Sequence, residues 1–114
     1  MSMNRNQKSI ILLLFLILFI PACSKNPWII WENSTITYTT TLKTLSDLRR
    51  AGKIDNITYK QIEEVRIIAA KSLDDMEEAA RNEEQISFAT STRIFDNALN
   101  SLIEWRVRVE KGDN

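Results

Sequence analysis

The sequence predicts an all-α fold, an antiparallel three-helix bundle that follows a cleaved signal peptide. Three observations predict it. The chain has 114 residues but only two Gly and two Pro, too few turn-forming residues for a loop-rich sheet protein. From about residue 33 the apolar residues recur at the helical period of 3.6. The first 22 residues instead have the layout of a signal peptide.

Residues 1–22 are predicted to be this signal peptide. Arg5 and Lys8 supply a basic n-region, and residues 10–20 are an unbroken run of Ile, Leu and Phe. This run is shorter than the roughly 20 apolar residues that a spanning helix needs. An uncleaved single anchor over residues 9–31 is the alternative.

The end of this segment, Ile20-Pro21-Ala22-Cys23, resembles the lipobox of bacterial lipoproteins. The resemblance implies that the Cys23 thiol is diacylated, that the peptide bond before it is cut, and that the new amino terminus is acylated. The alternative is an ordinary free thiol. Ser24 resembles the residue that lets lipoproteins travel to the outer membrane, which implies an envelope protein anchored there and facing the periplasm.

Residues 23–32 are expected to form the lipidated cysteine and a tether, and residues 33–111 the bundle. The apolar cluster 28–31 has two interpretations. Tryptophan favours a membrane interface, where its ring is partly wet and partly in lipid. Alternatively, Trp31 and one Ile begin the first core helix. The two are compatible if Trp28 lies at the lipid and Trp31 in the bundle.

The first helix is expected from about Asn33 to the sequence Arg49-Arg50-Ala51-Gly52. Basic residues suit the negative end of a helix, and Gly supplies the left-handed residue that follows it. The Thr-rich stretch 35–44 could form a strand, because β-branched residues lose side-chain freedom in a helix. The periodicity favours a helix, with an apolar stripe of Trp31, Tyr38, Leu42, Leu45 and Leu48.

The second helix is expected to begin at a capping box over residues 58–61, with Ile57 and Ile62 as its hydrophobic staple. Asp55 is an alternative N-cap. The helix is expected to end near Arg81-Asn82. Its apolar face comprises Ile62, Val65, Ala69, Leu73, Met76 and Ala80.

The third helix is expected from about Ser87, with a frayed tail over residues 112–114. An ion pair is expected between Glu104 and Arg108, one helical turn apart. Matched helix lengths and short connections predict antiparallel neighbours. An apolar seam repeats every seven residues at Phe88, Phe95, Leu102 and Val109, joined by Ser91, Ala98, Leu99 and Trp105.

A second resemblance covers about residues 40–80. The turn Ala51-Gly52-Lys53-Ile54-Asp55, the helix start Tyr59-x-x-Ile62 and two helices rich in small residues look like small helical lipoproteins encoded by bacteriophages and prophages. Most members of that group have no assigned activity.

The composition excludes several kinds of chemistry. The chain has no His and one Cys, which excludes zinc sites of the Cys/His kind, Ser-His-Asp catalysis and an internal disulfide. The acidic stretch 74–84 lacks a calcium-loop spacing and is interpreted as a solvated helix face. Acidic and basic side chains nearly balance, so nucleic acid is not an expected partner. We expect no enzyme, no cofactor and no metal.

The function expected is that of a non-enzymatic envelope lipoprotein, of phage or prophage origin, that binds another envelope protein in phage exclusion or in lysis. The alternative is a structural lipoprotein or a carrier of a small apolar ligand. The topology predicts a membrane-distal end that gathers basic residues, and a proximal end with the acidic stretch 74–84. Basic residues near helix C-termini are also expected without a partner. The candidate partner-binding residues are Arg49, Arg50, Arg106 and Arg108, accompanied by Lys53 and Lys111.

Overall fold

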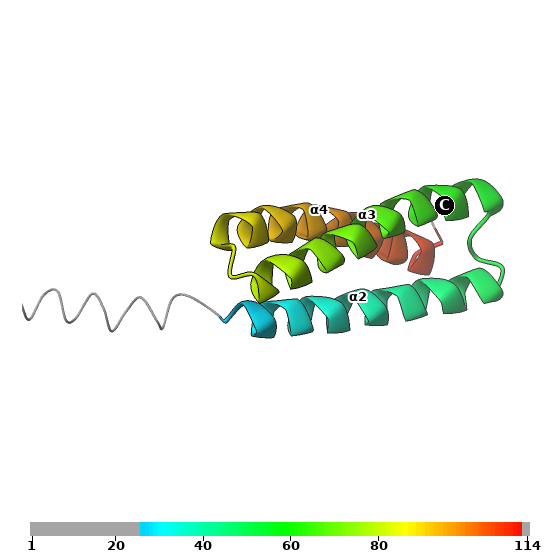
Figure 1. Ribbon diagram of the computed structural model, residues 1–114. Helices are drawn as coiled ribbons and strands as arrows, with labels where there is room; N and C mark the ends of the chain where they lie inside the picture. The colour runs from blue at the N-terminus through cyan, green and yellow to red at the C-terminus, as the bar shows by residue number, and fades with distance from the viewer. Residues whose placement is uncertain (1–25, 113–114) are drawn as a thin grey trace, which may run out of the picture.

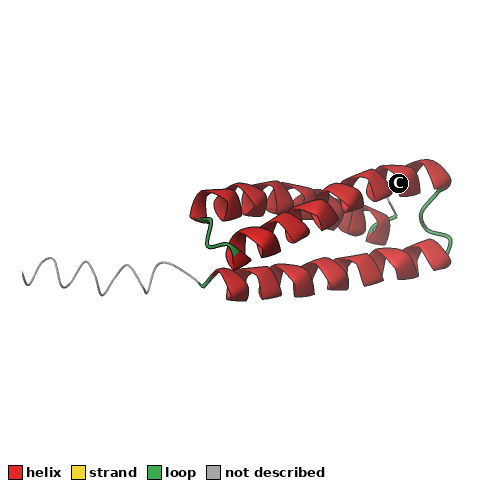
Figure 2. Ribbon diagram, viewed as in Figure 1, coloured by secondary structure: helices red, strands yellow, loops and turns green. Residues whose placement is uncertain are grey.

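The computed structural model describes residues 26–112 and places them in three helices, α2 (Pro27–Arg50), α3 (Asn56–Arg81) and α4 (Gln85–Glu110). The helices lie side by side and short turns at opposite ends join them, so consecutive helices run antiparallel (Figure 1). No strand occurs among residues 26–112 (Figure 2). The predicted all-α three-helix bundle is confirmed. The signal peptide expected over residues 1–22, and Cys23, lie outside the described residues.

Helix α2 begins six residues before its expected start. The Asn26 side chain caps the helix, since its Oδ1 accepts a hydrogen bond from the Trp28 amide at 2.8 Å. Pro27 occupies the first helical position, where no backbone N–H is needed and its fixed φ suits a helix. The expected tether over 23–32 is therefore wrong for residues 27–32, which form the first turns of α2.

The Thr-rich stretch of α2 is helical, as its periodicity predicted. Its hydroxyl groups bond back to carbonyl oxygens one turn earlier, so these polar groups are satisfied within the helix. Thr41, which the predicted stripe left out, is 1% exposed and faces the core. The threonines that donate to the carbonyl oxygen four residues earlier are Thr35, Thr37, Thr39, Thr41 and Thr44.

Helix α3 begins at the alternative N-cap, so the capping box at residues 58–61 is wrong. The Asp55 carboxylate accepts a hydrogen bond from the Thr58 amide at 2.7 Å, which makes Thr58 the third residue of the helix. The expected staple is also wrong, because Ile57 is 75% exposed. The start at Asp55 instead allows Ile54, just before the cap, to be buried.

The core forms along the predicted apolar stripes. The seven-residue seam of α4 is confirmed, with Phe95 and Leu102 fully buried. In α2 only Tyr38 and Leu45 of the predicted stripe are buried, and its other members are partly exposed. Helices α3 and α4 pack more closely against each other than either packs against α2. The buried residues of α3 include Ile62, Ala69, Ser72, Leu73, Met76, Ala79 and Ala80.

The end of α4 differs from expectation in its charged contacts. The Glu104–Arg108 ion pair is wrong, because the Arg108 guanidinium lies over the Trp105 ring, 5.1 Å from its centroid. The ion pair of this turn joins Arg106 Nε and Glu110 Oε1 at 3.7 Å. Gly112 follows the helix with φ of 83°, in the left-handed region that a residue without Cβ adopts freely.

Candidate functional site

The bundle has two ends of different chemistry. The basic pole comprises the α2–α3 turn and the end of α4, which lie at the same end of the molecule (Figure 1). A small hollow lined by Lys53 and by residues 109–112 shows that the turn lies beside the last turn of α4. The basic residues therefore share one end, as the topology predicted: Arg49, Arg50, Lys53, Arg106, Arg108 and Lys111.

Arg49 is held inside the bundle's own α2–α3 turn. Its guanidinium donates to the Ile54 carbonyl oxygen and to Asn56 Oδ1, each at 2.6 Å. It also lies over the Tyr59 ring, 4.5 Å from the centroid, where the ring face attracts a cation. Arg49 therefore closes the turn, which limits its freedom to meet a partner.

Arg50 is the more accessible of the two. Its side chain is 77% exposed, donates to Ser46 Oγ at 3.3 Å and lies 3.8 Å from Asp47 Oδ1. Exposed pairs of this kind contribute about 0–1 kcal/mol, so a partner's carboxylate could replace Asp47 at little cost.

A shallow groove of about 260 Å³ lies beside Arg49 and Arg50, between α2 and α3. Its apolar lining includes Leu42, Leu45 and Ile62. Arg66 also lines the groove. The apolar pattern gives no signal for Arg66, although it follows Tyr59 by two helical turns on the same face. Glu63 lies 2.8 Å from Arg66 Nε, and this hydrogen bond raises the pKa of Arg66.

The other two candidate residues do not line this groove. The Arg106 side chain is 31% exposed, and its buried Nε has no hydrogen-bond partner within residues 26–112, since 3.7 Å to Glu110 is too long. Arg108 is exposed and stacks on Trp105. The structure thus brings Arg49 and Arg50 together and leaves Arg106 and Arg108 on a different helix of the same pole.

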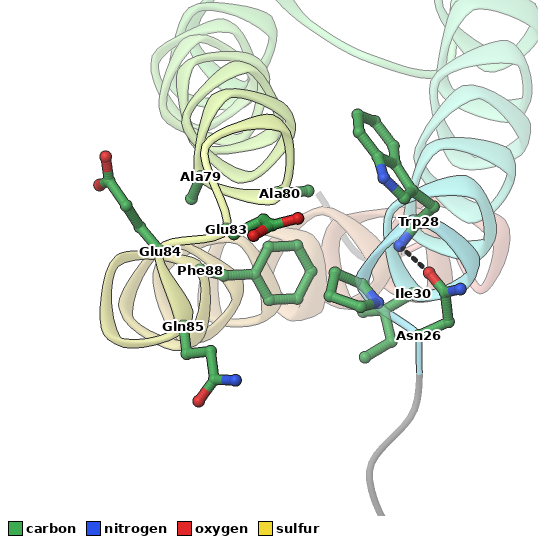
Figure 3. Close-up of a pocket in the computed structure, with 10 residues that line it drawn as sticks. Asn26, Trp28, Ile30, Ala79, Ala80, Glu83, Glu84, Gln85 and Phe88 are labelled. Carbon is green, nitrogen blue, oxygen red and sulfur yellow. Dashed lines mark hydrogen bonds between the residues drawn. The ribbon is translucent and has the colours of Figure 1, made fainter. Parts of the chain in front are cut away.

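The opposite end, which we call the N-terminal pole, contains a larger hollow of about 650 Å³. It lies between the start of α2 and the α3–α4 turn. Figure 3 shows Phe88 reaching from α4 into the space beside Ala79 and Ala80, while Glu84 and Gln85 point away from it. The residues lining it are Asn26, Pro27, Trp28, Ile30, Ala79, Ala80, Glu83, Glu84, Gln85 and Phe88.

The sequence predicts the apolar cluster on one side of this hollow but not the hollow itself. The cluster at residues 28–31 divides as one interpretation allowed: Ile30 and Trp31 pack partly buried against the core, whereas Trp28 and Ile29 are 42% and 54% exposed. On the other side of the hollow, the residue that the apolar pattern identifies is Phe88, which follows the α3–α4 turn by a few residues. The antiparallel topology predicted that these two segments share one end, but periodicity could not show that their side chains line a common hollow.

The N-terminal pole also carries exposed apolar and acidic side chains. Ile86, in the first turn of α4, is 85% exposed. Glu83 adopts a left-handed φ of 55°, and Glu84 precedes α4 without a capping hydrogen bond from its side chain. Both carboxylates are exposed, in line with the interpretation of stretch 74–84 as largely solvated. Within residues 26–112 no three acidic or cysteine side chains are grouped as metal ligands would be.

No family model, no curated protein and no solved structure matches this chain. Within the described part of the chain, no helix is both long enough and apolar enough to cross a bilayer.

Proposed function

We propose that this chain is a lipid-anchored protein of a bacterial cell envelope, of phage or prophage origin, that acts by binding another envelope protein without enzymatic chemistry. One observation carries the proposal. The lipobox-like sequence at residues 20–23 ends three residues before Asn26, the N-cap of a folded bundle. An export signal followed at once by a domain with its own core is the arrangement that a secreted, anchored protein needs.

The anchor would orient the bundle. One acyl chain binds a membrane only marginally, at about 0.8 kcal/mol per buried methylene, so the two or three chains implied at Cys23 would make attachment durable. The N-terminal pole would then face the bilayer. Since α2 has 24 residues, the basic pole would stand about 36 Å farther out, where a partner in the periplasm could reach it.

The partner surface proposed is the basic pole, with Arg49, Arg50, Arg106 and Arg108 as its charged rim. The contacts of Arg50 and Arg108 favour these two as the residues that meet the partner, because Arg49 closes the turn. An acidic patch is the complementary chemistry. Exposed charges are screened beyond about 8 Å at physiological ionic strength, so the association should weaken as salt rises.

Metabolic labelling with a radioactive fatty acid tests the anchor. The wild-type chain should incorporate label and fractionate with the outer membrane, whereas Cys23→Ala should do neither. The substitution lies outside the bundle, so it leaves the core intact. Equal labelling of the two proteins would refute lipid attachment at Cys23.

A pair of charge reversals tests the partner surface. Arg50→Glu/Arg108→Glu should abolish in-cell crosslinking to the partner and the phenotype that the gene confers, whether exclusion of a second phage or timing of lysis. The matched control, Asp74→Lys/Glu78→Lys, alters exposed charges nearer the other end and should retain both. If only the Asp74→Lys/Glu78→Lys variant loses the crosslink and the phenotype, the partner binds nearer the N-terminal pole and the proposal is refuted.

The hollow at the N-terminal pole favours a second candidate function, carriage of a small apolar ligand. Its volume is in the range of small-molecule sites, and Trp28, Ile30 and Phe88 supply an apolar lining. A carrier should bind a detached fatty acid saturably with one-to-one stoichiometry. Isothermal titration of the purified protein with a soluble fatty acid would show no such saturation if the chain carries no ligand.

A further inference from the structure

We propose that the N-terminal pole is seated in the membrane interface, so that Trp28, Ile29 and Ile86 lie among the lipid headgroups and lipid covers the hollow beside Phe88. This rests on the proposed function insofar as it requires an anchor ahead of residue 26. It goes further, because it assigns a second, non-covalent contact between the folded bundle and the bilayer.

The apolar side chains at this pole come from two helices that are distant in sequence. Trp28 and Ile86 each occupy the second position of their helix, α2 and α4, and are 42% and 85% exposed. Ile29 adds a third exposed side chain. Residues of both helices, among them Trp28, Gln85 and Phe88, line the same hollow (Figure 3). The starts of α2 and α4, which carry the three exposed side chains, therefore lie at one end of the bundle.

The length of chain outside the bundle decides what covers this end. Three residue steps separate Cys23 from Asn26, and a fully extended chain spans about 3.5 Å per residue, hence about 10 Å. The headgroup region on each side of the hydrocarbon is itself roughly 5–8 Å thick. An anchor at Cys23 therefore keeps the pole within or next to the headgroups.

Residue chemistry agrees with that position. Tryptophan is enriched at membrane interfaces, because its ring is largely apolar and its indole N–H remains hydrated. Ile57 has the same helix position in α3 and is 75% exposed, but it lies at the basic pole, away from the anchor. Ile57 thus offers a matched control for Ile86.

The acidic side chains determine which lipid fits. Glu83 and Glu84 place two carboxylates at the rim, and they repel anionic headgroups within a Debye length. The ammonium groups of zwitterionic lipids attract them. The expected occupant is therefore a zwitterionic surface, and anionic lipid should move the pole outward.

The test measures tryptophan depth in vesicles. Protein purified from the membranes of cells that express the full chain is reconstituted into phosphatidylcholine brominated near the top of the acyl chains. With Trp31→Phe/Trp105→Phe, the remaining Trp28 should be strongly quenched. With Trp28→Phe/Trp31→Phe, the remaining Trp105 should be almost unquenched. Equal quenching of the two would overturn the proposal.

Three further measurements do not depend on the double tryptophan variants folding. In the wild-type background, Trp28→Phe alone should remove most of the quenching. Ile86→Ser should reduce the quenching, whereas Ile57→Ser should leave it unchanged, and equal effects of the two would contradict the seating. When phosphatidylglycerol replaces unbrominated phosphatidylcholine at a fixed fraction of brominated lipid, the quenching should fall in wild type but not in Glu83→Gln/Glu84→Gln.

The fatty-acid labelling separates this inference from the function on which it rests. Labelled protein in which Trp28 and Trp105 are quenched alike would retain the lipid anchor and refute the seating. Unlabelled protein with selective quenching of Trp28 would refute lipidation and support the seating, since an uncleaved apolar segment would hold the same pole at the membrane.

Discussion

The α3/α4 hairpin and helix α2 are held in the bundle in different ways. Small side chains on α3, notably Ala69, Ser72 and Ala79, are buried at 4% exposure or less, and α3 lies closer to α4 than either lies to α2. Close approach of two backbones creates a large area of continuous van der Waals contact. The hairpin is therefore stabilised mainly by contact area.

Helix α2 is held by larger side chains that make a few directed contacts. Trp31 Nε1 donates to the Leu73 carbonyl oxygen at 3.2 Å, and the Tyr38 hydroxyl reaches the Arg66 carbonyl oxygen at 3.5 Å. The Tyr38 ring also meets Phe95 edge to face, with centroids 6.1 Å apart. Since bulky side chains hold α2 farther from its neighbours, α2 should separate from the hairpin more easily than the hairpin opens.

The largest expected effect comes from the residue that joins the two regions. Phe95→Ala should destabilise the bundle by about 3–5 kcal/mol, because it leaves a cavity in the core and removes the contact with Tyr38. Leu102→Ala should cost about 2–5 kcal/mol. Chemical unfolding measures both. Ile94→Ala, at a site that is 45% exposed, should stay close to wild type, and an unchanged Leu102→Ala would contradict the seam.

Overpacking should distinguish the two interfaces. Ala69→Leu inserts bulk between closely packed helices, where Ala69 is 0% exposed, and should cost roughly 1–3 kcal/mol. Thr41→Leu at a site that is 1% exposed on α2 should cost less, because α2 can shift outward. Thermal melting compares them. A larger loss for Thr41→Leu would mean that α2 is packed as tightly as the hairpin.

A smaller effect is expected from the directed contact at Trp31. Trp31→Phe keeps an aromatic side chain but replaces indole by the smaller phenyl ring and removes the hydrogen bond to Leu73, whose loss should cost about 0.5–1.5 kcal/mol. Amide exchange should rise in α2 more than in α3 or α4. Trp28→Phe is the control, because the Trp28 indole makes no hydrogen bond of this kind within residues 26–112. A uniform rise over all three helices would show that α2 opens only with the whole bundle.

The smallest effects concern pH. Hydrogen bonds from Thr58 lower the pKa of Asp55, so this cap adds stability above the ordinary carboxyl pKa and loses it as pH falls through the lowered value. Partial desolvation raises the pKa of Asp96, although the residue is exposed, so ionised Asp96 opposes folding only weakly at neutral pH.

Two substitutions should therefore act with opposite sign at pH 7. Asp55→Ala should lower the melting temperature and Asp96→Asn should raise it. Both differences from wild type should shrink near pH 3, below the ordinary carboxyl pKa of about 3.9. A gain from Asp96→Asn that persisted in acid would point to a cause other than the charge.

The sequence by itself determined the helices, because a helical period reports which face of each segment is buried. The Phe95 and Leu102 seam and the helical state of the Thr-rich stretch follow from that period. The predicted starts of α2 and α3 differ from the observed ones, and both differences depend on the choice of N-cap residue. Asn26-Pro27 is a helix start signal that lies ahead of the periodic stretch, and Asp55 competes with Thr58 as a cap of similar strength.

Only the tertiary structure decided how far apart the helix axes lie and which side chains contact one another at the ends. Periodicity carries no information on either, since both depend on the sizes of side chains facing one another across helices. The closer packing of α3 with α4, the hollow between Trp28 and Phe88, and the use of Arg49 to close a turn all arise in this way. Side chains adjacent in space but distant in sequence become visible only once the helices are packed.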